Sequence, residues 1–91
     1  MRLQWTGKAR SDLERLYEFL STVNRAAAGR AVRGLVAAPA LLQEHPRIGE
    51  RLDEFALREV RRLLVGRYEM RYEVQGETIF ILRIWHGREN R

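Results

Sequence analysis

The sequence predicts an α+β fold in which an N-terminal strand leads into an antiparallel pair of helices, followed by antiparallel strands that form a small twisted sheet. Two patterns support this prediction. Apolar residues recur at helical spacing between residues 8 and 43, and they alternate with polar residues from Arg67 onward. With 91 residues, of which 45% are hydrophobic, the chain is expected to form one domain over residues 1–91.

The first helix is expected to begin directly after a short strand at residues 2–5. The Thr6 hydroxyl can accept a hydrogen bond from a free amide of the first helical turn, so Thr6 is the expected N-cap. From Lys8 onward the apolar residues form one stripe that should face the core, and the charged residues should face elsewhere. The stripe contains Ala9, Leu13, Leu16, Tyr17 and Leu20, and the charged set contains Arg10, Asp12, Glu14, Arg15 and Glu18.

A second helix is expected from Ala26 to Gln43, with Asn24 as its cap. Its apolar positions repeat at helical spacing and include several alanines, which would let the two helices approach closely. Pro39 should kink this helix or end its regular part, because proline lacks the amide hydrogen that a helix interior uses. Residues 45–49 then close the helical half with turn-forming residues.

Three strands are expected after the helices. The clearest is residues 67–75, where polar and apolar residues alternate strictly, as on a strand with one solvated face. Residues 78–85 are apolar on both faces, as expected of a central strand, and Gly76 between the two runs predicts a tight hairpin. Residues 57–65, ahead of Gly66, predict a third strand that forms a second hairpin.

The side chains favour one register for the hairpin around Gly76. Pairing Val74 with Thr78 sets Glu69 opposite Arg83, a favourable cross-strand charge pair, and leaves a three-residue loop at residues 75–77. The face under the helices is then expected to contain Tyr68, Met70, Tyr72, Phe80, Leu82 and Ile84. The opposite face is expected to contain Glu69, Arg71, Ile79, Ile81, Arg83 and Trp85.

That opposite face is a candidate binding surface. Two helices can cover only one side of a small sheet, and Ile79, Ile81 and Trp85 would form an apolar patch among arginines on the other side. The alternatives are that the far ends of the chain, or a second copy in a homodimer, cover this patch.

Composition limits the kinds of site and partner. The sequence has no cysteine, and its two histidines, His45 and His86, are far apart, so we expect no disulfide, no metal site and no cofactor. It contains no apolar run of the roughly 20 residues that a membrane helix needs and no visible secretory leader, so we expect a cytoplasmic protein with no membrane partner. A net charge of +5 favours an acidic partner, either nucleic acid or an acidic protein.

Several stretches, in their order and spacing, resemble the RelE/ParE superfamily of toxins. The predicted order of strand, helix pair and hairpins resembles the fold of that family as well. The resemblance covers nearly the whole chain. Its stretches are Trp5-Thr6 leading into Ala9-x-x-Asp12-Leu13, the turn His45–Gly49, the strand pair Val60–Val74 and the closing strand Ile79–Arg88.

The resemblance implies the toxin of a type II toxin–antitoxin module, a growth inhibitor of the kind associated with plasmid stabilization. Its partner would be a cognate antitoxin whose extended or helical C-terminal segment wraps the toxin, and DNA would be contacted only through that complex. The family has two chemistries. RelE-like members cleave messenger RNA on the ribosome, and ParE-like members poison DNA gyrase without cleaving RNA themselves.

A RelE-like nuclease needs a general base, a general acid and cations around the scissile phosphate, and it needs no metal. The resemblance would make His86 the acid, with Glu50 or Glu59 as the base. Two positions depart from the nuclease pattern, because Glu69 stands where a phosphate-binding arginine is common and Gly87 stands where a functional aromatic is common. The cations would be Arg71, Arg61 and Arg62.

The two departures favour a ParE-like gyrase inhibitor, which has no catalytic residue. Its residues would be contact groups for the target and the antitoxin, since tryptophan and arginine most often anchor protein interfaces. A plain nucleic-acid-binding module is the remaining alternative, but the first helix is nearly balanced in charge and the exposed sheet face lacks an aromatic pair that could stack bases. The expected contact groups are Arg71, Ile79, Ile81, Arg83, Trp85, His86 and Arg88.

Overall fold

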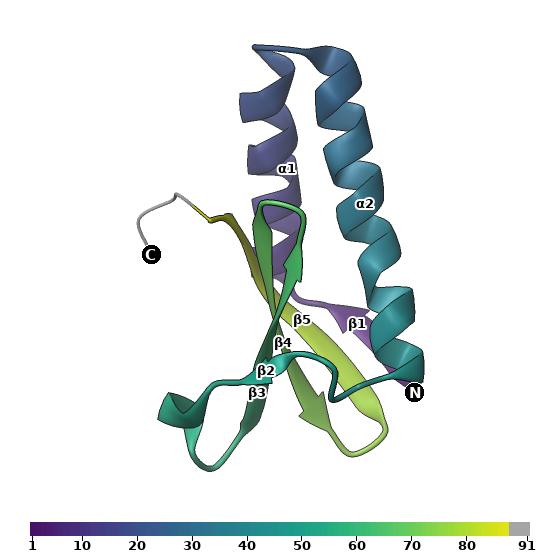
Figure 1. The fold of residues 1–91 in the computed structure, drawn as a ribbon, viewed down its shortest axis with the longest axis vertical. Coiled ribbons are helices and arrows are strands. Elements are labelled where there is room, and N and C mark those ends of the chain that lie inside the picture. Colours follow the sequence, from purple (N-terminus) through teal and green to yellow (C-terminus); the bar gives the residue numbers. More distant parts are fainter. Residues whose placement is uncertain (88–91) are drawn as a thin grey trace.

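A computed structural model describes residues 1–87 and has a two-helix hairpin packed against a five-stranded sheet (Figure 1). The strand order is β1-β5-β4-β3-β2, with β1 parallel to β5 and the other neighbours antiparallel. The predicted α+β class and order of elements are confirmed. The elements are β1 (Arg2–Trp5), α1 (Gly7–Ser21), α2 (Arg25–Glu44), β2 (Glu50–Arg51), a 3₁₀ turn η1 (Asp53–Phe55), β3 (Glu59–Val65), β4 (Tyr68–Gln75) and β5 (Thr78–His86).

Both predicted helix caps are present. The Thr6 hydroxyl accepts from the Ala9 amide at 3.1 Å, and the Asn24 side-chain oxygen accepts from the Ala27 amide at 3.0 Å. Each bond satisfies one of the amides that the first turn of a helix leaves without a partner. Of the two outcomes expected for Pro39, a kink or the end of the regular helix, the second is wrong, because α2 continues to Glu44 and buries Pro39.

The core lies between the helices and the sheet. Its centre is made of side chains that are fully or nearly fully removed from solvent, and Tyr72 is the largest of them. The predicted burial of Met70, Tyr72 and Ile84 on this face is confirmed. The core cluster contains Ala9, Leu16, Leu35, Leu42, Met70, Tyr72, Val74, Ile79, Ile81 and Ile84.

The predicted register of the β4–β5 hairpin is wrong by one residue at its loop. Gln75 pairs with Thr78, so the loop contains only Gly76 and Glu77. Gly76 has a φ of +54°, which glycine adopts easily and which suits the first position of a two-residue hairpin loop. Because side chains alternate along a strand, the shift turns Ile79 and Ile81 toward the helices, where both are fully buried. The prediction that they lie on the open face is therefore wrong.

A β-bulge in β5 restores the predicted faces farther along the strand. Tyr72 pairs with Ile81 and Arg71 pairs with Arg83, so Leu82 is an extra residue without a partner on β4. The extra residue inverts the alternation, as a bulge does. After it, Ile84 lies in the core, and Arg83 and Trp85 lie on the opposite face as predicted.

A buried tyrosine holds the link between the helices and the sheet, residues 45–49, in place. The Tyr72 hydroxyl donates to the Pro46 carbonyl oxygen and accepts from the Gly49 amide, both at 2.9 Å. Burial raises the pKa of Tyr72, which keeps the hydroxyl protonated and able to donate. A Cβ at Gly49 would lie 2.6 Å from both this hydroxyl and the Arg62 carbonyl oxygen, so only glycine fits.

Two elements near the end of the link were not predicted. The short strand β2 pairs with β3 through Glu50 and Arg51, and η1 follows it. The third predicted strand consequently begins at Glu59 instead of residue 57. Within the described residues, no helix combines the length and the apolar character that spanning a membrane requires.

We predict that Tyr72→Phe destabilises the fold by about 1–3 kcal/mol, because it leaves the Gly49 amide and the Pro46 carbonyl without their partner in a buried place. Urea denaturation would measure the free energy of unfolding. Tyr17→Phe is the matched control, since Tyr17 is 42% exposed, and its effect should stay within about 0.5 kcal/mol. Equal effects of the two substitutions would contradict the role given to the Tyr72 hydroxyl.

Candidate functional site

The sheet face turned away from the helices, here called the open face, contains a row of arginines. Arg62 on β3 pairs with Arg71 on β4, and Arg71 pairs with Arg83 on β5. Directly paired residues lie on the same face of neighbouring strands, which are about 4.8 Å apart. We call these three residues the arginine row. Its three positive charges would repel one another strongly if no negative charge lay nearby.

Two aromatic rings, Trp85 and Phe55, lie against guanidinium groups of the arginine row. The Arg71 guanidinium carbon lies 4.7 Å from the centre of the Trp85 ring and 5.9 Å from the centre of the Phe55 ring. The Arg83 guanidinium carbon lies 5.0 Å from the same Trp85 ring. Cation–π attraction therefore holds both guanidinium groups against flat surfaces. Sequence analysis missed Phe55, whose only signal was an aromatic residue in a short polar stretch ahead of a strand.

A buried carboxylate compensates the middle of the row. Glu69 is only 2% exposed, and its Oε2 accepts a hydrogen bond from Arg71 Nη2 at 3.1 Å. Its Oε1 lies 3.6 Å from Arg62 Nη1, and Arg62 also donates to Glu50. The predicted pair of Glu69 with Arg83 is wrong, because the bulge at Leu82 sets Glu69 opposite Trp85 instead.

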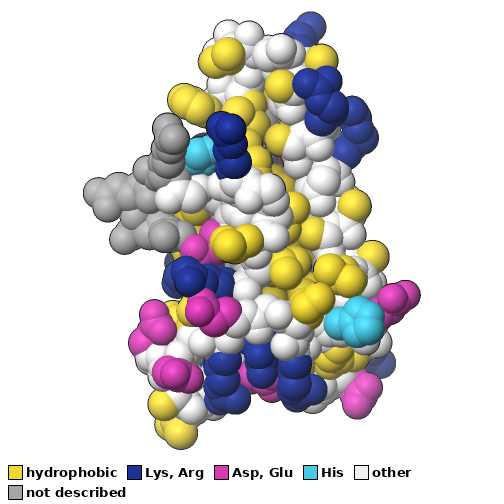
Figure 2. Space-filling view, viewed as in Figure 1, with side chains coloured by type: hydrophobic (Ala, Val, Ile, Leu, Met, Phe, Trp, Pro, Cys, Tyr) yellow, Lys and Arg dark blue, Asp and Glu magenta, His cyan; other side chains and the backbone are white. Residues whose placement is uncertain are grey.

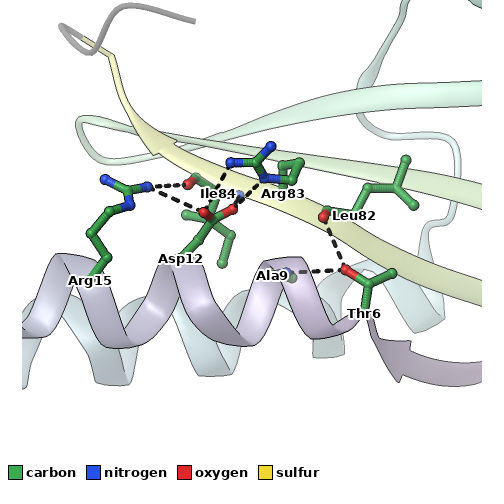
Figure 3. A network of polar contacts seen from close by, with 7 residues as sticks. All are labelled: Thr6, Ala9, Asp12, Arg15, Leu82, Arg83 and Ile84. Atoms are coloured by element: carbon green, nitrogen blue, oxygen red, sulfur yellow. Dashed lines mark hydrogen bonds and ion pairs between the residues drawn. The ribbon is translucent and has the colours of Figure 1, made fainter.

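The third arginine is held by a carboxylate from α1 (Figure 3). Arg83 Nε donates to Asp12 Oδ2 at 2.8 Å and Arg83 Nη2 donates to Oδ1 at 3.2 Å. Asp12 is 4% exposed, so the expectation that it faces away from the core is wrong. Burial on its own would raise the pKa of Asp12, but the hydrogen bonds from Arg83, from the Ile84 amide and from Arg15 outweigh it and lower the pKa.

Asp12 belongs to a set of side chains that replaces a missing strand. The pairing of β1 with β5 ends at Ile81, and beyond it the outer edge of β5 runs along α1. There the Thr6 hydroxyl donates to the Leu82 carbonyl at 3.0 Å, and Asp12 accepts from the Ile84 amide at 2.8 Å. Arg15 donates to the Ile84 carbonyl at 3.3 Å (Figure 3). The N-cap of α1 and two side chains of the helix thus satisfy the backbone of the strand edge.

The candidate nuclease residues are divided between the two faces of the sheet. Arg62, Arg71 and Glu50 lie on the open face, because they are in one cross-strand row. Arg61 pairs with Tyr72 and His86 pairs with Tyr68, so both belong to the helix side. The His86 ring packs edge-on against Tyr68, with the ring centres 5.3 Å apart.

Arg61 and Glu59 are occupied by contacts with the link. Arg61 donates to the Gly49 carbonyl at 2.7 Å and to Glu59 at 2.9 Å, and Glu59 also accepts from Arg47 at 3.0 Å. Burial would raise the pKa of Glu59, but the two arginines outweigh it and lower the pKa. A carboxylate with a lowered pKa and two fixed partners is a poor general base.

The predicted contact groups are partly brought together. Arg71, Arg83 and Trp85 form one stacked unit on the open face, whereas His86 lies on the helix side. Ile79 and Ile81 are in the core, as described above, and Arg88 lies outside the described residues. Among residues 1–87 there is no group of three or more histidine, aspartate or glutamate side chains that could hold a metal ion.

Comparison with known proteins identifies relatives of this chain. The model of the family described as "ParE toxin of type II toxin-antitoxin system, parDE" matches residues 3–91. A chain in the structure of the chromosomal ParDE TA system from P. aeruginosa is similar, with a TM-score of 0.77 and 29% sequence identity over 94% of this chain and 95% of that chain. No curated protein sequence matches the chain.

We predict that Asp12→Asn lowers the free energy of unfolding by about 1–3 kcal/mol at pH 7, because the amide keeps the shape but loses the charge that Arg83 and Arg15 compensate. The pKa of Asp12 is lowered in the folded state, so its stabilisation is complete above the unfolded pKa of about 3.9 and is lost as the pH falls through the folded pKa.

The free energies of unfolding of the wild type and of Asp12→Asn should therefore converge below about pH 4, as measured by urea denaturation across the pH range. Asp53→Asn, a change of the same chemistry at an exposed position, is the control and should follow the wild type. A difference that stays constant with pH would show that the Asp12 charge is not the cause.

Proposed function

Because the chain belongs to the ParE toxin family of type II toxin–antitoxin systems, we propose that it inhibits growth by poisoning DNA gyrase and that a cognate antitoxin neutralises it. In this proposal the protein carries out no reaction of its own. It binds its target through fixed side chains, and DNA is contacted only through the complex with the antitoxin. A cytoplasmic location follows from such a target.

The observation that carries the proposal is the compensated state of the arginine row. Each arginine already has a carboxylate partner, since Glu50 and Glu69 serve Arg62, Glu69 serves Arg71, and Asp12 serves Arg83. A nuclease needs cations that are free to take the charge developing on the phosphate. Arginines neutralised and stacked on aromatic rings instead resemble the rigid anchors of protein interfaces.

The separation of the acid–base groups supports the same proposal. Proton transfer requires the general acid within hydrogen-bond reach of the reacting atoms. His86 lies on the helix side at the end of β5, opposite the face that holds Arg62, Arg71 and Glu50. A substrate bound on the open face would therefore have the arginines without the histidine.

Within this proposal the contact groups are Arg71, Arg83 and Trp85, with His86 and Arg88 next to them in the chain. Trp85 is largely buried and orients the two guanidinium groups, and the side chains of Arg71 and Arg83 remain 23% and 37% exposed. Such preorganised side chains lose little conformational freedom on binding, which favours affinity.

The test is a gyrase assay with the purified toxin. We expect the wild type to trap DNA cleavage complexes with gyrase and supercoiled plasmid. Arg71→Gln should reduce trapping by about tenfold or more, because loss of an interface anchor commonly costs over about 1.4 kcal/mol. Arg33→Gln on α2 makes the same charge change at an exposed position far along the chain and should trap normally. Thermal melting would verify that both variants are folded.

Two other results would overturn the proposal. Codon-spaced, ribosome-dependent cuts in messenger RNA that disappear in His86→Ala, without any gyrase trapping, would establish the RelE-like nuclease. Absence of growth arrest when the chain is expressed alone would show that the chain does not act as a toxin. A short reading frame upstream, whose product restores growth on co-expression, is the expected antitoxin.

A further inference from the structure

Residues 52–58, here called the strap, join β2 to β3 and reach across β3 to β4. The Leu52 amide donates to the Val60 carbonyl of β3 at 2.9 Å. At the other end of the strap, Arg58 donates to both carboxylate oxygens of Glu73 on β4, at 2.7 and 3.1 Å. Figure 2 shows acidic and basic side chains side by side in the region of η1. The strap is therefore fixed to two strands of the sheet.

The middle of the strap places Phe55 against the arginine row. The Phe55 amide donates to the Leu52 carbonyl at 3.3 Å, and the Phe55 carbonyl accepts from the Arg58 amide at 2.7 Å. The half-buried ring has its centre 5.8 Å from the guanidinium carbon of Arg58 and 5.9 Å from that of Arg71. One ring thus contacts a cation of the strap and a cation of the sheet.

Together with Trp85, Phe55 forms an alternating series of cations and rings, here called the ladder. Each cation of the ladder also donates to a buried carboxylate, which is at most 4% exposed. Contacts of both kinds fix a guanidinium group before any partner binds, which favours affinity. In order, the ladder consists of Arg58, Phe55, Arg71, Trp85 and Arg83.

Arg71 depends on the rings more than the other two cations of the ladder do. Arg58 and Arg83 each donate two hydrogen bonds to one carboxylate, and two such bonds fix the plane of a guanidinium group. Arg71 donates one, from Nη2 to Glu69, and its Nε is buried without a hydrogen-bond partner among the described residues. A single bond leaves the guanidinium free to turn, so contact with aromatic rings decides where its outer edge points.

We propose that Phe55 is a positioning residue of the gyrase-binding surface, a role that rests on the proposed function, in which Arg71 contacts gyrase. The Phe55 ring holds the Arg71 guanidinium in the orientation that binds the target. Phe55 acts through Arg71, so its effect on binding disappears when the guanidinium is removed. The position requires a ring and not merely apolar bulk, because the attraction comes from the negative face of the ring.

The first measurement is gyrase trapping by Phe55→Leu, which keeps an apolar side chain and removes the ring. We expect trapping to be roughly fivefold weaker, as for the loss of one partly buried cation–π contact. Phe55→Tyr keeps the ring and should trap within about twofold of the wild type. Equal trapping by Phe55→Leu and the wild type, or equal losses in the two variants, would overturn the proposal.

Folding of each variant is verified by thermal melting. If Phe55→Leu does not fold, Phe55→Met takes its place, because methionine fills irregular apolar space and also lacks the ring. Its expected loss of trapping is the same, and full trapping by a folded Phe55→Met would count against the proposal in the same way.

The same substitution in an Arg71→Gln background separates positioning from direct contact. If Phe55 acts through Arg71, Phe55→Leu causes no further loss once the guanidinium is gone. If the double variant instead loses trapping by the product of the two single losses, Phe55 acts independently of Arg71 and the proposal is wrong.

Exchange of the Arg71 Nε hydrogen, followed by NMR on the full chain alone, requires no gyrase. We expect Phe55→Leu to speed this exchange by roughly tenfold or more, because losing the ring opens the contact beside the buried Nε. The Arg83 Nε, which donates to Asp12, should keep its wild-type rate and is the internal control.

The two measurements distinguish failure of this role from failure of the proposed function. Unchanged exchange at Arg71 Nε in Phe55→Leu would refute the role of Phe55, even if the wild type traps gyrase. Absence of trapping by the wild type would refute the gyrase target itself, and with it the binding role of Arg71, whatever the exchange rates are.

Discussion

The carboxylate of Asp12 is the contact on which the rest of the structure depends. It joins α1 to the backbone of β5 at the place where β1 no longer pairs with that strand. There it accepts hydrogen bonds from both the Ile84 amide and the Arg83 guanidinium. The helix is thereby fixed against the sheet, and the Arg83 guanidinium is held over the Trp85 ring. Without Asp12 the Ile84 amide would lose its hydrogen-bond partner, and Arg83 would lose the carboxylate that holds it at the end of the arginine row.

The open face is best understood as a connected set of charges rather than as separate residues. Glu69 is enclosed between Arg62 and Arg71, and the Arg71 guanidinium lies over the rings of Trp85 and Phe55. Buried ion pairs add little net stability when the desolvation of both partners is counted, but removing one partner is costly. The network therefore defines the geometry of the face more than it strengthens the fold.

Local patterns allowed most elements to be predicted, and long-range contacts account for the errors. Thr6 and Asn24 were identifiable as caps because capping acts within one helical turn. The predicted register was wrong because it was chosen to pair Glu69 with Arg83, and because nothing local indicates the bulge at Leu82. Asp12 looks like a surface residue on a helical wheel, since its partners Arg83 and Ile84 lie far along the chain.

The bulge at Leu82 changes which positions of β5 face the core. Before the bulge Ile79 and Ile81 point into the core; after it Ile84 does, and Arg83 and Trp85 lie on the face turned away from the helices. A substitution at Ile79 or Ile81 therefore changes the packing of the core, whereas one at Arg83 changes the arginine row. A single unpaired residue thus lets one strand supply apolar side chains to the interior and, two positions farther on, a cation to the open face.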